Sequence, residues 1–123
     1  MGSYIIKKVP SGVKFDLKAA NGEVIATSEV YTTQAACEKG IESVRKNAVI
    51  APVEDQTVRN YQAEKNPKFE VYLDKAEQFR FRLKASNGEV LVFSENYTTK
   101  NNALNGIASV KKNAPDSPIK QID

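Results

Sequence analysis

The chain has 123 residues, of which 41% are hydrophobic and 27% charged, with 18 Lys and Arg against 15 Asp and Glu. This length allows one compact domain or two very small ones, and the apolar fraction excludes a wholly disordered chain. The absence of His and the single Cys exclude an internal disulfide and a cysteine-rich zinc site, and they remove the usual base of neutral-pH catalysis. A net charge of +3 is too small to indicate nucleic acid or an anionic membrane as the partner.

The chain opens with a pattern of three strands. A strand is expected at residues 4–9, and Phe15 and Leu17 then alternate with polar residues in the period of a half-buried strand. Asn21-Gly22 predicts a two-residue type I′ hairpin turn, in which both residues have positive φ. A third strand should follow this turn.

A helix is predicted after the third strand. Thr32-Thr33 offers hydroxyl N-caps, and Arg45-Lys46 places cations in the last turn, where they suit the helix dipole. Gly40 is an unfavourable residue inside a helix and predicts a close approach of the helix backbone to the sheet or to another helix. The predicted apolar face consists of Cys37, Ile41, Val44 and Ala48.

The segment from residue 15 to residue 48 is repeated at residues 81–114, and the two copies align without gaps. About 20 of the 34 aligned positions are identical, and the offset is 66. The second copy should therefore repeat the same elements, with a first strand at 69–74, the Asn87-Gly88 turn and a helix up to Ala114. A type I′ turn would pair Ala85 with Val90, Leu83 with Val92 and Phe81 with Ser94.

These units predict an α+β fold, a tandem duplication of two βββα units packed with pseudo-twofold symmetry as one domain. The first unit spans residues 1–48 and the second 69–114. Residues 49–68 are expected to form a linker, and residues 115–123, with two prolines, a flexible tail.

The predicted register leaves apolar residues on the outer face of a strand. Leu91 and Phe93 would point outward, with Ile25 and Thr27 as their counterparts in the first copy. The partner unit, the linker, a second chain or a ligand should cover this face. Phe93 is the sharper case, because its counterpart Thr27 is polar.

The motifs resemble those of one known family. Asn-Gly-Glu-Val, Ser-Glu-x-Tyr-Thr-Thr and Gly-Ile-x-Ser-Val-Lys/Arg-Lys-Asn-Ala are similar to the YegP-like family (DUF1508, UPF0339) over residues 4–48 and 69–114. The resemblance implies a tandem βββα fold. It implies no activity, because the family is uncharacterised and supplies no catalytic residues.

Two Glu positions are shared by the copies and are the main candidates for acid–base chemistry. They are the pair Glu23 and Glu29 in the first copy and the pair Glu89 and Glu95 in the second. A structural role is favoured, since the first of each pair follows a turn and the second can accept N–H bonds at a helix start. Tyr31 and Tyr97 are expected to pack before the N-caps, and Cys37 to be a small buried residue. We therefore expect no catalytic residue, cofactor or metal site.

A basic stripe is the remaining candidate. Arg80, Arg82 and Lys84 should line the outward face of one strand, but Asp16 replaces Arg82 in the first copy and interrupts the stripe. The predicted function is a small non-enzymatic interaction module that self-associates as a homodimer through a strand edge or the Leu91/Phe93 face. The alternative is weak binding of nucleic acid or another anionic ligand by the basic strand. The expected localisation is cytoplasmic, without a membrane partner.

Overall fold

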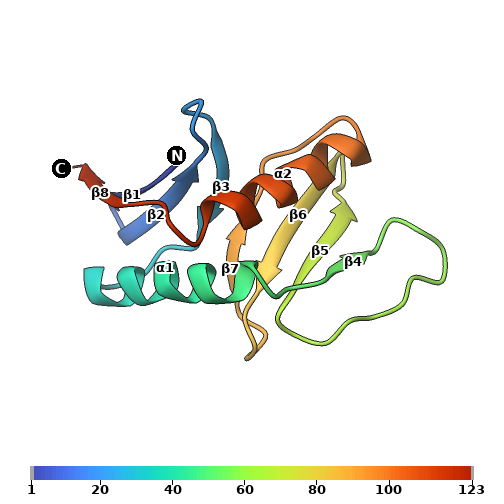
Figure 1. Ribbon diagram of the computed structural model, residues 1–123, viewed down its shortest axis with the longest axis horizontal. Coiled ribbons are helices and arrows are strands. Elements are labelled where there is room, and N and C mark those ends of the chain that lie inside the picture. The colour runs from blue at the N-terminus through green and yellow to red at the C-terminus, as the bar shows by residue number, and fades with distance from the viewer. Residues whose placement is uncertain (1, 123) are drawn as a thin grey trace.

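Ten elements follow one another along residues 2–122, which the computed structural model describes (Figure 1). They are β1 (Ser3–Val9), β2 (Gly12–Lys18), β3 (Val24–Ser28), α1 (Gln34–Ala48), β4 (Val53–Asp55), β5 (Lys68–Leu73), β6 (Phe79–Lys84), β7 (Val90–Phe93), α2 (Lys100–Asn113) and β8 (Ile119–Ile122). Strands lie where the sequence alternates, and the helices begin directly after Thr33 and Thr99. Thr33 and Thr99 are the N-caps, each accepting a backbone N–H bond at 3.1 Å.

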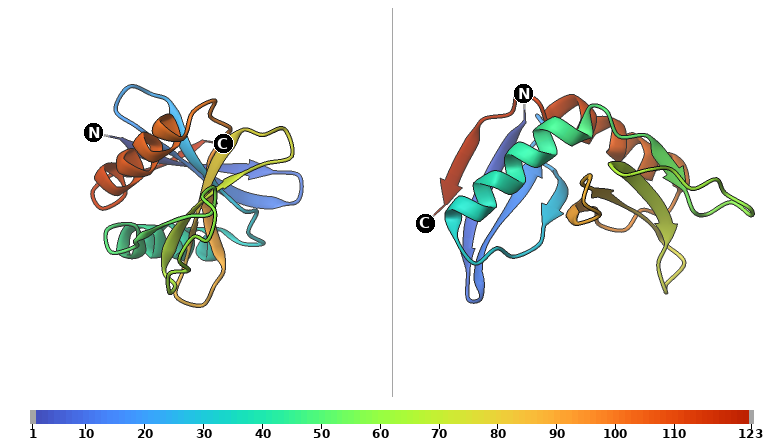
Figure 2. Two further views of the ribbon diagram at one scale, coloured as in Figure 1. Left: turned by 90° about the vertical axis from the view of Figure 1, so that its right-hand side faces the viewer. Right: turned by 90° about the horizontal axis from the view of Figure 1, so that it is seen from below.

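All eight strands belong to one sheet, in the order β4-β5-β6-β7-β3-β2-β1-β8. The two halves meet where β3 and β7 pair antiparallel, with Thr27 opposite Phe93 and Ser28 opposite Val92. Both helices lie on the same side of this sheet, and the strands of its two halves point in clearly different directions (Figure 2). The protein is therefore an α+β fold with a single continuous sheet.

The structure differs from the prediction at the linker and at the tail. Residues 53–55 form β4, which pairs parallel with β5, and residues 119–122 form β8, which pairs parallel with β1. The prolines do not prevent this, because a proline at the start of a strand still offers its carbonyl. Pro52 O accepts the Phe69 N–H and Pro118 O accepts the Tyr4 N–H, both at 2.8 Å. Strand β4 thus follows the helix of the first half but pairs in the second half, and β8 follows the helix of the second half but pairs in the first.

A cation near the end of each helix binds the segment that follows the other helix. Arg45 Nη2 donates to Ser117 O at 2.6 Å, and Lys111 Nζ donates to Ala51 O at 2.7 Å. Each cation also lies over the ring of an aromatic residue in its own half, at 5.2 Å for Tyr4 and 5.6 Å for Phe69. These side chains therefore bind backbone carbonyls of the segments that lead into β8 and β4, a role that the helix dipole alone did not predict.

The hairpin turns are wider than predicted. Gly22 and Gly88 have φ values of 87° and 86°, but neither preceding Asn has a positive φ. The Gly88 N–H donates to Ala85 O, and the Ala85 N–H donates to Glu89 O, both at 2.9 Å. This is a turn followed by a glycine bulge, so the type I′ turn and the pairing of Ala85 with Val90 are wrong.

A second irregularity in each hairpin changes which residues face the core. Leu83 pairs with Val92 as predicted, but Lys84 pairs with Val90, so Leu91 is an extra residue in β7. The first half has the same shift beside Leu17. Leu91 and Ile25 are consequently buried, 5% and 8% exposed, and do not lie on the outer face.

Replacing Gly88 with Val should destabilise the protein by about 1–2 kcal/mol, because a β-branched residue is strained at positive φ. The nearest atom to an added Cβ is Asn66 Nδ2 at 3.5 Å, so backbone strain rather than a clash sets the cost. Thermal melting measures the effect, and Gly22→Val should behave alike. An unchanged melting temperature would contradict this view of the turn.

The glycine inside α1 makes room for a tyrosine ring. An added Cβ on Gly40 would lie 2.3 Å from Tyr31 Oη and 2.7 Å from Tyr31 Cζ. The ring cannot easily move, since it stacks on Phe15 with centroids 6.3 Å apart, and Tyr31 pairs with Val13. The close approach predicted for this glycine is therefore made by the side chain of a residue that pairs with β2 beyond the end of β3.

Replacing Gly40 with Ala should destabilise the protein by about 2 kcal/mol, because the clash exceeds the helix-propensity gain of about 1 kcal/mol. Urea unfolding of the variant measures this difference. In a Tyr31→Leu background the same substitution should become neutral or stabilising, as a double-mutant cycle would show. An equal loss in both backgrounds would exclude the tyrosine as the cause.

Candidate binding surface

The sheet has one face without helices, which we call the open face. Residues that pair across neighbouring strands share a face, and the register from β4 to β8 therefore defines one row across the sheet. The row consists of Glu54, Glu70, Arg82, Phe93, Thr27, Asp16, Ile5 and Lys120. By alternation the open face also carries Lys7, Lys14, Lys18, Lys68, Tyr72, Arg80 and Lys84, with Asp74 directly after β5.

In the first half, one buried carboxylate lies beneath two lysines. Asp16 Oδ2 is 2.6 Å from Lys7 Nζ, and Asp16 Oδ1 is 3.8 Å from Lys14 Nζ. The Asp16 side chain is only 4% exposed, whereas those of the lysines are 38% and 27% exposed. Asp16 therefore does not interrupt the basic surface as predicted, because the lysines lie between it and solvent.

The second half repeats this layering with a larger network. Glu70 accepts from Arg82 Nε at 2.5 Å and lies 3.3 Å from both Lys68 Nζ and Lys84 Nζ. Lys68 Nζ also lies 2.8 Å from Glu54, a carboxylate 2% exposed. Burial opposes ionisation of Glu70, but the hydrogen bonds from Arg82 and Lys84 outweigh it and lower its pKa.

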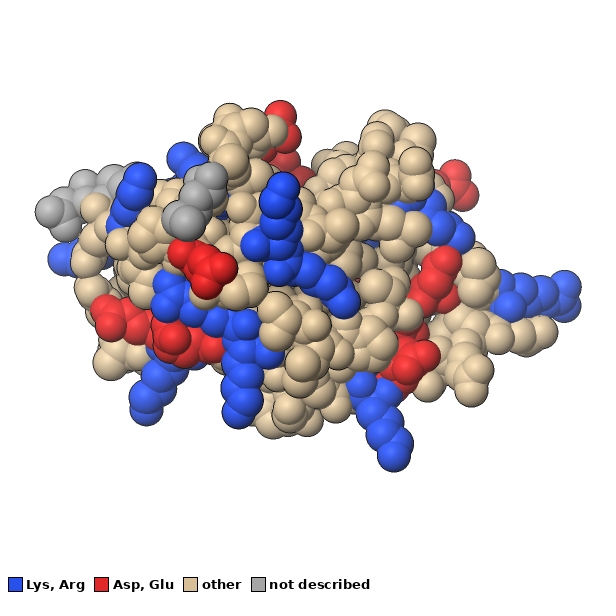
Figure 3. Space-filling view, in the orientation of Figure 1, with Lys and Arg blue, Asp and Glu red and all other residues tan. Residues whose placement is uncertain are grey.

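The open face has an excess of positive charge. Its described residues include eight Lys and Arg but four Asp and Glu, so the excess is larger than the net charge of +3 of the whole chain. On the helix side, by contrast, blue and red side chains are interspersed (Figure 3). The charge of the molecule is thus unevenly distributed, with its net positive charge on the open face.

The predicted basic residues Arg80, Arg82 and Lys84 do lie together, each beside a carboxylate. Arg80 donates through Nε to Asp74 at 2.7 Å, and Arg82 donates through Nε to Glu70. Neither bond uses the terminal nitrogens of the guanidinium groups. These nitrogens have the fork geometry that binds phosphate or carboxylate oxygens in pairs.

Two aromatic side chains lie among these charges. The guanidinium carbon of Arg82 is 4.4 Å from the centroid of the Tyr72 ring, a cation–π contact. Phe93 is partly exposed in the middle of the sheet, beside Thr27 and Arg82. Strand β4 of the predicted linker lies at the sheet edge, with β5 and β6 between it and Phe93.

The thiol and the two phenols considered for catalysis are fully or partly buried. Cys37 is fully buried, and burial raises the pKa of its thiol to about 11. Burial also raises the pKa of Tyr31 and Tyr97. The bonds that Glu29 and Glu95 were expected to accept at the helix starts are made instead to Thr33 and Thr99.

Among residues 2–122, no cluster of three or more Asp, Glu, Cys or His side chains is placed to hold a metal ion. No helix in the described part of the chain is both long and apolar enough to cross a membrane.

Sequence reasoning missed a groove between each helix and the hairpin turn of the other half. One groove of about 420 Å³ lies between Glu42–Asn47 and the turn at Ala85–Asn87. Another, of about 450 Å³, lies between Ser109–Ser117 and the turn at Ala19–Asn21. In each groove a side-chain amide of the helix bonds within the helix, Asn47 to Ser43 and Asn113 to Ser109, so these amide N–H groups already have partners.

Comparisons with known proteins agree on one family. The family described as "Domain of unknown function (DUF1508)" matches residues 12–55 and 74–121. UPF0339 protein YegP of Yersinia pestis is 42% identical over 123 residues, 99% of this chain and 96% of that protein. YegP of Escherichia coli O157:H7 is 39% identical over 114 residues, covering 93% and 90%. The chain belongs to the YegP-like family, UPF0339.

Two solved structures have the same fold. The solution structure of yegP from E. coli, a protein of unknown function, gives a TM-score of 0.78 at 36% identity, over 98% of this chain and 91% of that one. UPF0339 protein SO3888 from Shewanella oneidensis gives 0.80 at 34% identity, over 98% and 90%.

A UPF0339 protein of Treponema denticola matches only 45% of this chain, over 55 residues at 54% identity, which are 95% of its own length.

Proposed function

We propose that this protein, built from two duplicated βββα units, is a non-enzymatic binding module that holds an anionic ligand on its open face. The excess of cations on that face is the observation that supports the proposal. Buried carboxylates beneath the cations fix their positions, which limits the side-chain entropy lost on binding. The terminal nitrogens of Arg80 and Arg82 then offer donors for phosphate-like oxygens.

The experiment compares charge variants on the two sides of the molecule. Lys14→Ala with Lys84→Ala should weaken binding of a heparin oligosaccharide about tenfold, as expected when two charge contacts are lost. The fold should persist, because Asp16 keeps Lys7 and Glu70 keeps Arg82. Isothermal titration at increasing salt should show affinity falling as ionic strength rises.

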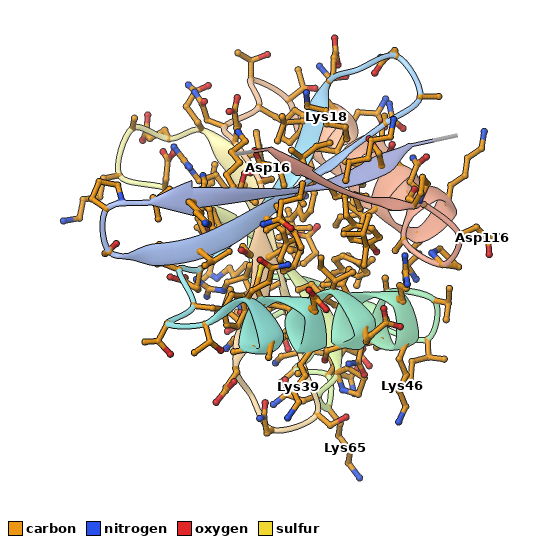
Figure 4. All side chains as sticks on the ribbon, turned by 90° about the vertical axis from the view of Figure 1, so that its left-hand side faces the viewer. Asp16, Lys18, Lys39, Lys46, Lys65 and Asp116 are labelled. Carbon is orange, nitrogen blue, oxygen red and sulfur yellow. The ribbon has the colours of Figure 1, made fainter. Side chains whose placement is uncertain are left out.

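Lys39→Ala with Lys46→Ala is the matched control. It removes the same charge from α1, which lies on the helix side of the sheet and not on the open face (Figure 4). This control should leave the affinity nearly unchanged. Equal losses in both double variants, or binding that is insensitive to salt, would refute the open face as the site.

Self-association is a second candidate, favoured by the free edge of β8. This strand pairs with β1 on one side only, and Ile119 is 40% exposed. At the opposite edge strand, β4, the side chain of Glu54 accepts the Glu64 N–H from the following loop at 2.7 Å. An unprotected edge is a template for pairing with a second copy.

Sedimentation velocity at high concentration tests this candidate. A homodimer is expected, and Ile119→Lys should shift it to monomer if the edge makes the contact, whereas Phe93→Lys should do so if the open face does. Far-UV circular dichroism should remain unchanged in both variants. A monomeric wild type would refute self-association.

A further inference from the structure

We infer that the open face binds single-stranded nucleic acid, with one base stacked on Phe93. This inference rests on the proposed function and names the anionic ligand of the same face. Three features carry it: the position of the ring, the span of the cations, and the difference between the two halves of the sheet.

Phe93 lies at the centre of the cationic surface. It belongs to β7, one of the two middle strands, and its cross-strand neighbours on this face are Arg82 and Thr27. Base–aromatic stacking is a main source of affinity for single strands, and it needs a ring that is reachable from solvent among phosphate-binding cations. Phe93 meets both requirements, since it is partly exposed.

Tyr72, by contrast, is already occupied. The Arg82 guanidinium lies over its ring at 4.4 Å, and Arg82 is held there by its bond to Glu70. A base would have to displace this cation to stack on Tyr72. The structure thus leaves one free aromatic platform on the described open face, with Arg82 beside it.

The cations extend to both sides of that platform. Lys68, Arg82 and Lys84 lie on β5 and β6, and Lys14 and Lys7 lie on β2 and β1. From β5 to β1 there are five strand spacings, about 24 Å at about 4.8 Å each. This length suits a short single strand, comparable with the smaller sites of about four nucleotides known for OB folds.

The exposed ring should favour a single strand over a duplex. Unpaired bases can turn toward an exposed ring, whereas the bases of a duplex remain stacked on one another. A protein that used only the lysines would bind both forms through their phosphates. Phe93 is therefore the residue that should distinguish the two.

The repeat supplies matched variants for the test. Thr27 occupies the position in the first half that Phe93 occupies in the second, and the two residues are paired across β3 and β7. Phe93→Thr gives both halves the same residue, at a site where the fold already accepts Thr. Thr27→Phe adds a second ring beside the first.

Fluorescence anisotropy would compare an oligothymidylate of about ten nucleotides with an abasic oligomer of the same length and with the matching duplex. Phe93→Thr should lower the affinity for oligothymidylate about tenfold or more. Its affinity for the abasic oligomer and the salt slope should stay the same, because no phosphate contact is lost. Thr27→Phe should raise the affinity for oligothymidylate, and this gain does not depend on the stability of the first variant.

The outcomes separate this inference from the proposed function. If all three probes bind with salt dependence and Phe93→Thr loses nothing, stacking is refuted while anion binding stands. Tighter binding of the duplex than of the single strand would also overturn the inference. If none of the anionic probes binds and heparin does not bind either, the proposed function itself fails.

Discussion

Residues 1–50 produced on their own should show no cooperative thermal unfolding. The isolated half would keep β1, β2, β3 and α1, but α1 also packs on β7, and β1 also pairs with β8, which belong to the missing part. Phe15, Leu17 and Ile41, all fully buried in the whole chain, belong to a core that this part completes. A chain of about 50 residues with an incomplete core is too small to be stable without such a partner.

Differential scanning calorimetry of the fragment and of the full chain measures the difference. Addition of residues 51–123 should restore a transition, because the two fragments together contain every strand of the sheet. A transition that appears only at high fragment concentration would mean that a second copy replaces the missing half, which mass action distinguishes. A sharp, concentration-independent transition of monomeric residues 1–50 would contradict the single-domain interpretation.

The repeat explains why the core could be predicted and the sheet edges could not. Leu83 pairs with Val92, and the helices begin after Thr33 and Thr99, because alternation and capping are local signals that occur twice. Strands β4 and β8 are three and four residues long and pair with distant segments. Their pairing depends on tertiary contacts such as Arg45 with Ser117, which no periodicity in the sequence indicates.

The bulges explain the errors on the outer face. Strict alternation placed Leu91 beside Phe93, but the extra residue in β7 turns Leu91 inward and leaves Phe93 where it was predicted. Asn-Gly signals a hairpin without specifying a bulge farther along the strand, so one residue of register was lost. The basic residues of β6 were placed correctly, while the role of Asp16 required the cross-strand positions of Lys7 and Lys14.

Replacing Glu70 with Gln should destabilise the protein by about 3 kcal/mol. The carboxylate is 4% exposed and lies beside Lys68, Arg82 and Lys84, so its neutralisation leaves three partly buried cations facing one another. Removing one partner of a buried ion pair costs about 3–5 kcal/mol, and the partial exposure of Arg82 favours the lower figure.

Urea unfolding at neutral pH gives the midpoint and slope that measure this loss. Asp74→Asn is the matched control, since its partner Arg80 is 35% exposed and solvent can replace the contact, so no measurable loss is expected. Equal stability of wild type and Glu70→Gln would show that the network does not stabilise the sheet.

The same network predicts how stability depends on pH. Burial opposes ionisation of Glu54, but hydrogen bonds from Lys68, Gln56 and the Glu64 N–H outweigh it and lower its pKa from 4.5 to about 2, and the pKa of Glu70 is lowered as well. Below about pH 4.5 the unfolded chain therefore binds protons that the folded protein does not, so the free energy of unfolding falls as the pH falls toward 2. Between pH 7 and pH 5 these groups are ionised in both states and contribute no slope.

Urea midpoints measured from pH 7 to pH 2 should show this profile, and the acid-side decrease should be smaller in Glu70→Gln, because that variant has one carboxylate fewer to protonate. A decrease of the same size in the variant and the wild type would assign the acid sensitivity to other carboxylates.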